Sequence, residues 1–272
     1  MLQRRQLPKK GNFAILVLLL VGTVAAMLML ARCGGGSGHR AESGGDTLDV
    51  AIEYSPVTYY SYDDTLGGFS YDLLRHLSAR HHRPMKFHPI TTLEVGLEGL
   101  EAGFYDIVVA QFPVTGENKQ RYLFSSALYI DNQVLLQRRR DDGTLRVNTQ
   151  LDLAHATVTI VKGSPMKERL AGLSREIGDT IYVAEDPDYG PEQLMMMVAA
   201  GEVELAVINE HIARSLAPSY PQVDVSTRVS FSQFQALTLR HDNRALCDTL
   251  SLWIDDAKRS PFYHSLSSRY FK

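Results

Sequence analysis

Beyond its N-terminal segment, the chain alternates between strand-like and helix-like patterns of apolar residues. Residues 47–54 alternate polar and apolar side chains and include β-branched residues, which is typical of a strand. Residues 71–81 then carry apolar side chains at helical spacing, and residues 85–90 return to a strand. A helix over 93–103 and a strand over 105–110 continue this order. Such alternation predicts an α/β lobe with a mainly parallel sheet flanked by helices.

The same order recurs in the second half of the chain. After Ile130 a strand-like stretch runs into charged residues and a turn, which predicts a hinge near residues 130–140. Alternating strands and helices then follow over 156–163, 165–174, 180–184, 191–201 and 203–209. The chain closes with a returning strand at 234–240 and helices at 243–257 and 261–270.

These patterns predict a domain of two α/β lobes that spans residues 47–272. The first lobe is expected over 47–134 and 236–272, and the second over 140–230. The chain would therefore cross between the lobes twice, near 130–140 and 230–240. Two crossings allow the lobes to close on a ligand like jaws.

The N-terminal residues 1–33 are typical of a targeting segment. Basic residues between Arg4 and Lys10 precede an uncharged apolar run over residues 13–31. The run is about long enough to span a bilayer as an uncleaved anchor. It is followed by Cys33 in a lipobox-like context, although Arg32 replaces the usual small residue. We expect either a lipid on Cys33 or a membrane anchor, followed by a flexible linker over 34–46.

This segment also predicts the location of the protein. Basic residues before an apolar run keep the N-terminus inside, so the domain would be held on the periplasmic side of the cell envelope. A cleaved, soluble protein is the third alternative.

Composition and charge narrow the function classes. The chain is 44% hydrophobic and 22% charged, which is ordinary for a globular protein. Its formal net charge is −3, and residues 1–40 hold basic residues but no acid, so the remainder is distinctly acidic. Nucleic-acid binding is therefore not expected.

Candidate metal and catalytic chemistry is sparse. His76, His81, His82 and His88 lack carboxylates or cysteines at ligand spacing, so we expect a basic surface patch and no metal site. Cys247 lies among apolar residues at helical spacing and is expected to be a buried helical side chain. No cofactor is expected.

Five segments, in this order and spacing, resemble the bacterial extracellular solute-binding proteins of family 3. They are Tyr54-Ser55-Pro56 with Gly68-Phe69; residues 105–110; Thr115-Gly116-Glu117 with Phe124-Ser125 and Tyr129; Leu151-Asp152-Leu153 with Lys162-Gly163-Ser164; and residues 201–204. The resemblance covers about residues 47–272 and implies the two-lobed type 2 periplasmic-binding fold.

The chain is also similar to the ligand-sensing half of the membrane-bound lytic transglycosylase F type of enzyme. It ends at Lys272, so we expect the catalytic half of that enzyme to be absent.

The resemblance implies a ligand site in the cleft between the lobes. Tyrosines after the first strand would stand at the mouth of the sheet, and Gly163 and Ser164 would offer backbone N–H groups and a hydroxyl. The expected ligand-binding residues are Tyr54, Tyr59, Tyr60, Gln111, Phe112, Thr115, Asn118, Gly163, Ser164, Asn209 and Glu210.

Two of these positions depart from the family's pattern for amino acids. Asn118 stands where such relatives usually carry an arginine for the α-carboxylate, and Asn209 where they carry an aspartate for the α-ammonium. We therefore expect a neutral, peptide-like or cell-wall-derived solute that is held by amides and aromatic rings.

Three functions remain open. The first is a monomeric binding protein that captures a small polar solute for an ABC transporter, with the permease encoded elsewhere. The second is a membrane-anchored sensor or regulatory module of cell-wall metabolism. The third is an enzyme similar to cyclohexadienyl dehydratase, but such an enzyme needs a cationic clamp, and Asn118 removes it. The prediction is therefore a binding protein and not an enzyme.

Overall fold

The computed structural model describes residues 47–63 and 65–271, which belong to a single compact unit. The predicted targeting segment, the lipidation at Cys33 and the linker over 34–46 lie outside the described residues. Within the described ranges no helix has the length and apolar character needed to cross a membrane.

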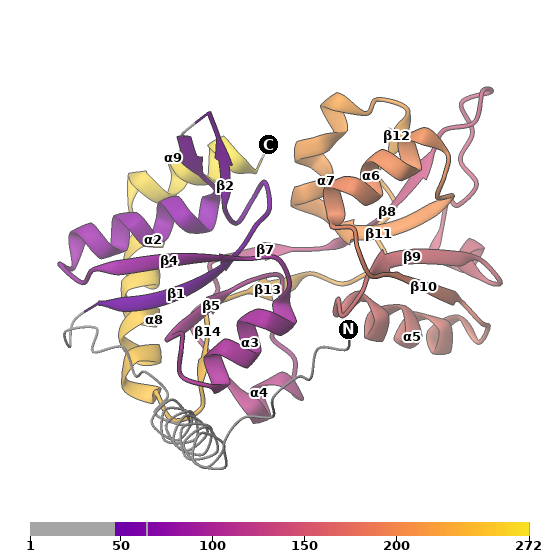
Figure 1. Cartoon of the computed structure of the whole chain (residues 1–272). Helices are drawn as coiled ribbons and strands as arrows, with labels where there is room; N and C mark the ends of the chain where they lie inside the picture. The colour runs from indigo at the N-terminus through magenta and orange to yellow at the C-terminus, as the bar shows by residue number, and fades with distance from the viewer. Residues whose placement is uncertain (1–46, 64, 272) are drawn as a thin grey trace, which may run out of the picture. The chain divides into compact units, whose positions relative to one another are not determined.

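The first lobe is built on a five-stranded sheet (Figure 1). Its strands follow the order β4 (Met85–Ile90), β1 (Leu48–Glu53), β5 (Ile107–Val109), β14 (Thr238–Arg240) and β6 (Tyr122–Phe124). β1 pairs in parallel with β4 and β5, as the strand–helix–strand order predicts. β14 is antiparallel to both of its neighbours.

The second lobe repeats this arrangement. Its sheet has the order β10 (Tyr182–Asp186), β9 (Thr157–Val161), β11 (Leu205–Asn209), β8 (Gln133–Arg138) and β12 (Val223–Asp224). β9 pairs in parallel with β10 and β11, whereas β8 is antiparallel to both of its neighbours. In each sheet the antiparallel strand comes directly after the chain has crossed from the other lobe. The predicted fold, two lobes with mostly parallel sheets, is confirmed.

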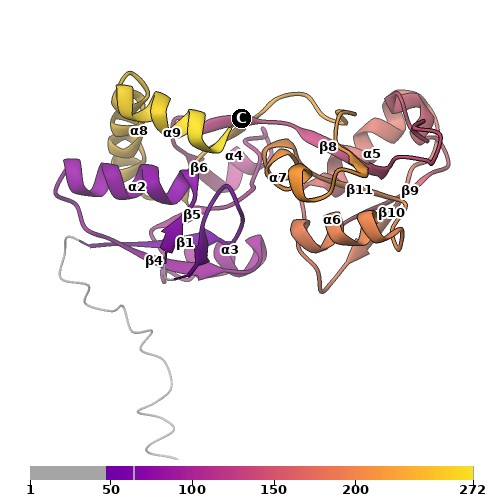
Figure 2. The same ribbon diagram turned by 90° about the horizontal axis from the view of Figure 1, so that it is seen from above.

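Helices cover both faces of the first sheet. Alternate residues of β1 face opposite ways: Val50 and Ile52 pack in one cluster with α2 (Phe69–Arg80), and Ala51 packs in another with α3 (Leu93–Glu101). Figures 1 and 2 show these two helices on opposite faces of the sheet.

The C-terminal helices complete the covering of the first lobe. α8 (Arg244–Lys258) and α9 (Pro261–Tyr270) pack against each other and against α2. Cys247 is buried on α8, as predicted.

Helices cover the second sheet in the same way. α5 (Met166–Ile177) packs on one face, and α6 (Pro191–Ala200) and α7 (Glu210–Leu216) pack on the other. The sequence patterns did not predict α7. They also placed a loop where the structure has a small hairpin of β2 (Tyr60–Tyr62) and β3 (Thr65–Gly67).

The segments that cross between the lobes are shorter than the predicted hinge regions 130–140 and 230–240. β7 (Tyr129–Asp131) and β13 (Gln233–Gln235) pair antiparallel to form a two-stranded ribbon between the sheets. The expected hinge over 130–140 is wrong in its second half, because β8 begins at Gln133 and is an internal strand of the second sheet. β8 is buried on both sides up to Gln137, so its apolar run reflects a central strand and not a hinge.

Candidate functional site

A cavity of about 450 Å³ lies between the two lobes. Its walls follow the carboxyl ends of four parallel strands: β1 and β4 in the first lobe, and β9 and β10 in the second. Ligands of open α/β sheets bind outside the carboxyl ends of the strands. The lining residues are Tyr54, Ser55, Pro56, Thr91, Thr92, Val161, Lys162, Pro187, Asp188, Tyr189, Gly190, Pro191, Glu192 and Gln193.

The first-lobe wall is built around Tyr54. This residue directly follows β1, and its backbone N–H donates to the carbonyl of Ile90 at 3.0 Å. Its ring meets the ring of Tyr59 edge to face, with centroids 6.3 Å apart, yet 48% of Tyr54 remains exposed. Thr92 caps α3 by accepting from the Val95 N–H at 3.4 Å. The wall therefore offers one exposed aromatic side chain beside backbone that is fixed by strand and cap hydrogen bonds.

The second-lobe wall is a turn that precedes α6. Asp186 Oδ1 accepts from the backbone N–H groups of Asp188 and Tyr189, both at 3.0 Å. Gln193 Oε1 accepts from the Gly190 N–H at 3.2 Å. These bonds hold Tyr189 in place, and 48% of this residue is exposed. A second tyrosine therefore faces the cavity from the opposite lobe.

The cavity also carries charges of both signs. Lys162 follows β9, and Asp188 and Glu192 lie on the facing turn and helix start. None of the three forms an ion pair with another part of the described chain. The three charges line the cavity together with the Thr91 hydroxyl, and the charge of Lys162 also acts on the Glu185 carboxylate, which pairs with Lys167.

Behind the first-lobe wall, two hydrogen bonds link Glu53 through Gln111 to Tyr129 of the crossing. Glu53 Oε2 accepts from the Gln111 backbone N–H at 2.8 Å, and Gln111 Nε2 donates to the hydroxyl of Tyr129 at 3.1 Å. Burial raises the pKa of Glu53 to about 7, against the lowering effect of the Gln111 hydrogen bond. Gln111, a predicted ligand residue, thus lies beside the crossing and does not line the cavity.

The predicted residues after β5 form a closed local turn. Thr115 Oγ1 accepts from the Asn118 N–H at 3.1 Å, and Asn118 Nδ2 donates to the Pro113 carbonyl at 3.0 Å. These bonds start the one-turn helix α4 (Asn118–Arg121). Phe112 is buried against Tyr122, with ring centroids 5.8 Å apart. None of Phe112, Thr115 and Asn118 lines the cavity, so their roles in ligand binding stay predictions.

The other predicted tyrosines pack within the first lobe. Tyr59 is buried between Tyr54 and Tyr71, with its ring centroid 5.2 Å from that of Tyr71. Tyr60 begins β2, and its ring lies so close to Gly67 that a Cβ there would come within 2.6 Å. Neither of the two lines the cavity.

Gly163 and Ser164 lie directly after Lys162 but outside the cavity lining. Gly163 has a φ of +71° and donates its N–H to Glu185 at 3.4 Å. Ser164 Oγ accepts from the Met166 N–H at 3.1 Å. The motif therefore forms a turn that leads into α5 (Met166–Ile177), whose N-cap is Pro165.

Asn209 and Glu210 lie at the second-lobe end of the crossing. Asn209 Nδ2 donates to Asp131 at 3.3 Å, and Glu210 accepts from Arg228 at 2.9 and 3.0 Å and from Arg214 at 2.8 Å. Burial alone would raise the pKa of Glu210, but the two arginines lower it to about 2. Both residues are engaged with the protein itself.

Of the predicted ligand residues, the structure places Tyr54 alone in the cavity lining. Sequence reasoning missed Tyr189, Asp188 and Glu192. Their signal was present as an Asp-Pro-Asp-Tyr-Gly turn before a helix, at the carboxyl end of a second-lobe strand.

The fold and the cavity define a two-lobed binding protein with its ligand site between the lobes. The model of the bacterial extracellular solute-binding proteins, family 3, matches residues 47–272, and the chain belongs to this family.

Curated relatives include both enzymes and binding proteins. Membrane-bound lytic murein transglycosylase F of Shewanella pealeana is 23% identical over 227 residues, which cover 82% of this chain and 46% of the relative. The chain therefore spans about half the length of these transglycosylase relatives. The L-cystine-binding protein TcyJ of Escherichia coli is 22% identical, with 96% of each chain covered.

Solved structures share the fold. An ancestral arginine-binding protein bound to arginine superposes with a TM-score of 0.71 at 18% identity, covering 84% of this chain and 99% of that one. An ancestral amino acid-binding protein described as a precursor of cyclohexadienyl dehydratase gives 0.68 at 21% identity, covering 84% and 96%.

Proposed function

We propose that the cavity between the lobes binds a small amino-acid-like or peptide-like solute, which the protein presents to an ABC transporter. The observation that supports this most is the composition of the cavity. Tyr54 and Tyr189 face it from opposite lobes, and Lys162 stands there with the carboxylates of Asp188 and Glu192. Closing the lobes would bring these groups around one solute.

The cavity's charges suit a solute that is itself charged at both ends. The Lys162 ammonium matches a carboxylate, and the carboxylates of Asp188 and Glu192 match an ammonium group. Exposed tyrosine faces pack against the apolar part of such a molecule. We predicted a neutral solute because Asn118 and Asn209 lack charge; the cavity extends this expectation to zwitterions held by other residues.

The comparisons support a solute of this size and class. Relatives that match this chain over most of their own length include proteins named for binding cystine, arginine or amino acids in general. The sensor function in cell-wall metabolism is the second candidate, and the similarity to the first half of transglycosylase F favours it. An enzyme is not proposed, because the family is one of binding proteins.

Calorimetric titration of the full chain in a neutral detergent tests the proposal. The probes are L-arginine, L-glutamine, L-cystine and a stem peptide of peptidoglycan. For a probe that binds, we expect Lys162→Gln to weaken binding at least about tenfold, since charge-assisted bonds contribute about 1.5–3 kcal/mol. We expect Tyr189→Ala to weaken it by loss of the aromatic face that packs against the solute. Tyr182→Ala is the matched control, because Tyr182 is exposed on β10 outside the cavity lining.

An Asn118→Ala variant tests whether the ligand binds in this cavity or at the positions that relatives usually use for amino acids. Affinity that is lost in Asn118→Ala but kept in Lys162→Gln would contradict the proposed cavity. Binding of the stem peptide alone, with no transporter partner, would favour the sensor function.

A further inference from the structure

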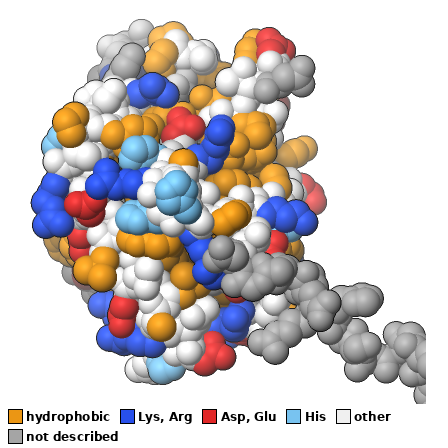
Figure 3. Space-filling model, turned by 90° about the vertical axis from the view of Figure 1, so that its left-hand side faces the viewer, with side chains coloured by type: hydrophobic (Ala, Val, Ile, Leu, Met, Phe, Trp, Pro, Cys, Tyr) orange, Lys and Arg blue, Asp and Glu red, His pale blue; other side chains and the backbone are white. Residues whose placement is uncertain are grey.

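The described part of the chain separates its charges between two regions. Figure 3 shows arginine, lysine and histidine side chains close together on the outer side of the first lobe, where the sequence predicted a basic patch. Residues 75–86, which end α2 and begin β4, contain four lysine and arginine residues and no acid. Residues 185–192 have the opposite composition, with four acids and no basic residue. Most of this acidic segment lines the cavity between the lobes.

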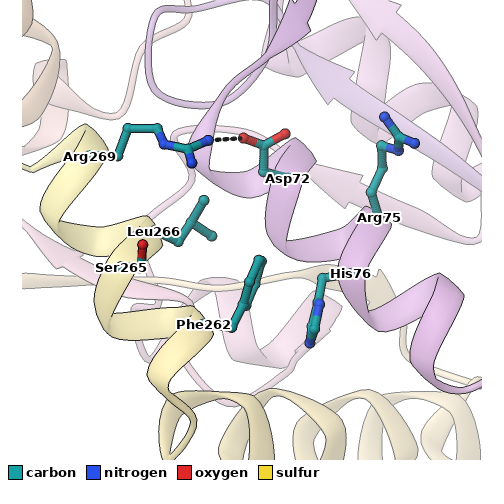
Figure 4. A pocket seen from close by; sticks show the side chains of 7 residues that line it. All are labelled: Asp72, Arg75, His76, Phe262, Ser265, Leu266 and Arg269. Atoms are coloured by element: carbon teal, nitrogen blue, oxygen red, sulfur yellow. Dashed lines mark ion pairs between the residues drawn. The ribbon is translucent and has the colours of Figure 1, made fainter.

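The cavity of about 370 Å³ between α2 and α9 has no such excess of acid. Figure 4 shows that Arg269 faces Asp72, 3.7 Å away, and that Arg75 points away from the other labelled side chains. The ring of His76 stacks on that of Phe262, with centroids 3.8 Å apart. The opposite charges that meet in this cavity are therefore paired within the protein, unlike those between the lobes.

The lining of the cavity between the lobes carries one basic and two acidic side chains, which are Lys162, Asp188 and Glu192. Part of the positive charge already serves the protein, because a hydrogen bond from Lys167 and the charge of Lys162 both lower the pKa of Glu185. Among the described residues, the first-lobe part of the lining contributes no charged side chain. The lining as a whole is therefore net negative.

The two acids of the lining flank an exposed aromatic ring on a fixed turn. Asp186 Oδ1 accepts from the N–H groups of Asp188 and Tyr189, both at 3.0 Å. Glu192 lies in the first turn of α6. Tyr189 is 48% exposed, and so is Tyr54 on the opposite wall. The face of a tyrosine ring attracts a cation, so the rings and the carboxylates of this cavity favour the same charge.

We propose that this cavity selects a solute with a second cation, such as an amino acid or dipeptide with a basic side chain. The inference rests on the proposed function and adds its specificity. A zwitterion offers one carboxylate to Lys162 and one ammonium group to one acid, which leaves the other acid without a partner. A solute with one carboxylate and two cations matches Lys162, Asp188 and Glu192 together.

The residues that select the second cation lie apart from the positions that the family resemblance assigns to amino acids. Asn118 and Asn209 stand at those positions, and each donates to an oxygen of the protein itself. Asp188 and Glu192 lie on the turn and helix start that follow β10. The charge preference of the site is therefore set by this turn of the second lobe.

The test compares matched solutes by calorimetric titration of the full chain in neutral detergent. L-Arginine and L-citrulline have similar shapes but differ in the charge of the side chain, and L-lysyl-L-alanine and L-norleucyl-L-alanine form the corresponding dipeptide pair. We expect the cationic member of at least one pair to bind about tenfold more tightly or better, the worth of one charge-assisted contact.

Variants assign this preference to the turn. Asp188→Asn and Glu192→Gln should each reduce the ratio of the two affinities at least about threefold, and more than they change the affinity for the neutral member. Glu202→Gln is the matched control, because it removes a carboxylate from an exposed position beyond the other end of α6 and should leave the ratio unchanged.

The outcomes separate this inference from the proposed function. Equal binding within each pair, or a preference that neither variant reduces, overturns the selection of a second cation and leaves solute binding intact. Binding of L-glutamine or L-cystine without binding of either cationic solute overturns it as well. Failure of these solutes and of the stem peptide to bind contradicts the proposed function itself.

Discussion

Glu53 is the residue whose ionisation should influence stability near neutral pH. Its pKa in the folded protein is about 7, against an ordinary value of 4.5, because the protein around the end of β1 shields its carboxyl group from water. Between these values the folded protein holds a proton that the unfolded chain has lost. The free energy of unfolding therefore falls as pH rises from about 4.5 to 7.

Replacing Glu53 by glutamine tests this sign. At about 1.4 kcal/mol per pKa unit, the contribution reaches at most about 3 kcal/mol. Urea unfolding at pH 5 and pH 8 should show a smaller loss of stability with pH in Glu53→Gln than in the unmodified protein. The same pH dependence of stability in both proteins would mean that the pKa of Glu53 in the folded protein is close to its ordinary value.

At the same scale, the sequence could not show which polar side chains are free. Asn118 and Asn209 lie in positions that the family uses for ligands, yet each donates to a protein oxygen, on Pro113 and on Asp131. Such bonds depend on tertiary geometry and leave no periodic signal in the sequence. Tyr54 was predictable because it directly follows a strand whose carboxyl end faces the cleft.

Gly68 controls how helix α2 begins. It has a φ of +125°, and a Cβ there would lie 2.4 Å from the carbonyl oxygen of Thr58. Its N–H also donates to the Tyr270 hydroxyl at 2.9 Å, which joins the start of α2 to the end of α9. Any side chain would therefore force the backbone apart at this junction.

We expect Gly68→Ala to lower the free energy of unfolding by about 3 kcal/mol or more, from backbone strain and a steric clash together. Gly103→Ala is the control, because Gly103 also has a positive φ, of +79°, but nothing lies within 4 Å of an added Cβ. That variant should lose only about 1 kcal/mol. Equal losses in urea unfolding would show that the contact with Thr58 is easily relieved.

Elements were predictable where burial is one-sided. Helices such as α8 keep an apolar stripe, so their periodicity is visible, whereas β1 is buried on both faces from Val50 to Ile52 and was predicted also from its β-branched residues. β8 is buried on both faces and ends in arginines, so it resembled a hinge. The hairpin of β2 and β3 is short and polar, and its pairing gives no pattern at this length.

At the scale of the whole molecule, the apolar core is continuous across the crossing. One cluster of buried residues includes Leu73 of α2, Tyr129 of the crossing and Met195 of α6. Phe271, which follows α9, stacks on His211 of α7 with centroids 4.1 Å apart and meets Tyr129 at 4.9 Å. The C-terminal end of the first lobe is thus packed directly against the second.

This continuity predicts that the two lobes unfold as one cooperative unit. Calorimetry should show a single transition whose calorimetric and van't Hoff enthalpies agree. Phe271→Ala removes the aromatic link, so it should lower the free energy of unfolding by about 2–3 kcal/mol and broaden or split the transition. Phe231→Ala is the matched control, since Phe231 is 81% exposed and should change stability by less than about 0.5 kcal/mol. Two separate transitions in the unmodified protein would show that the lobes are independent and that their contact carries no stability.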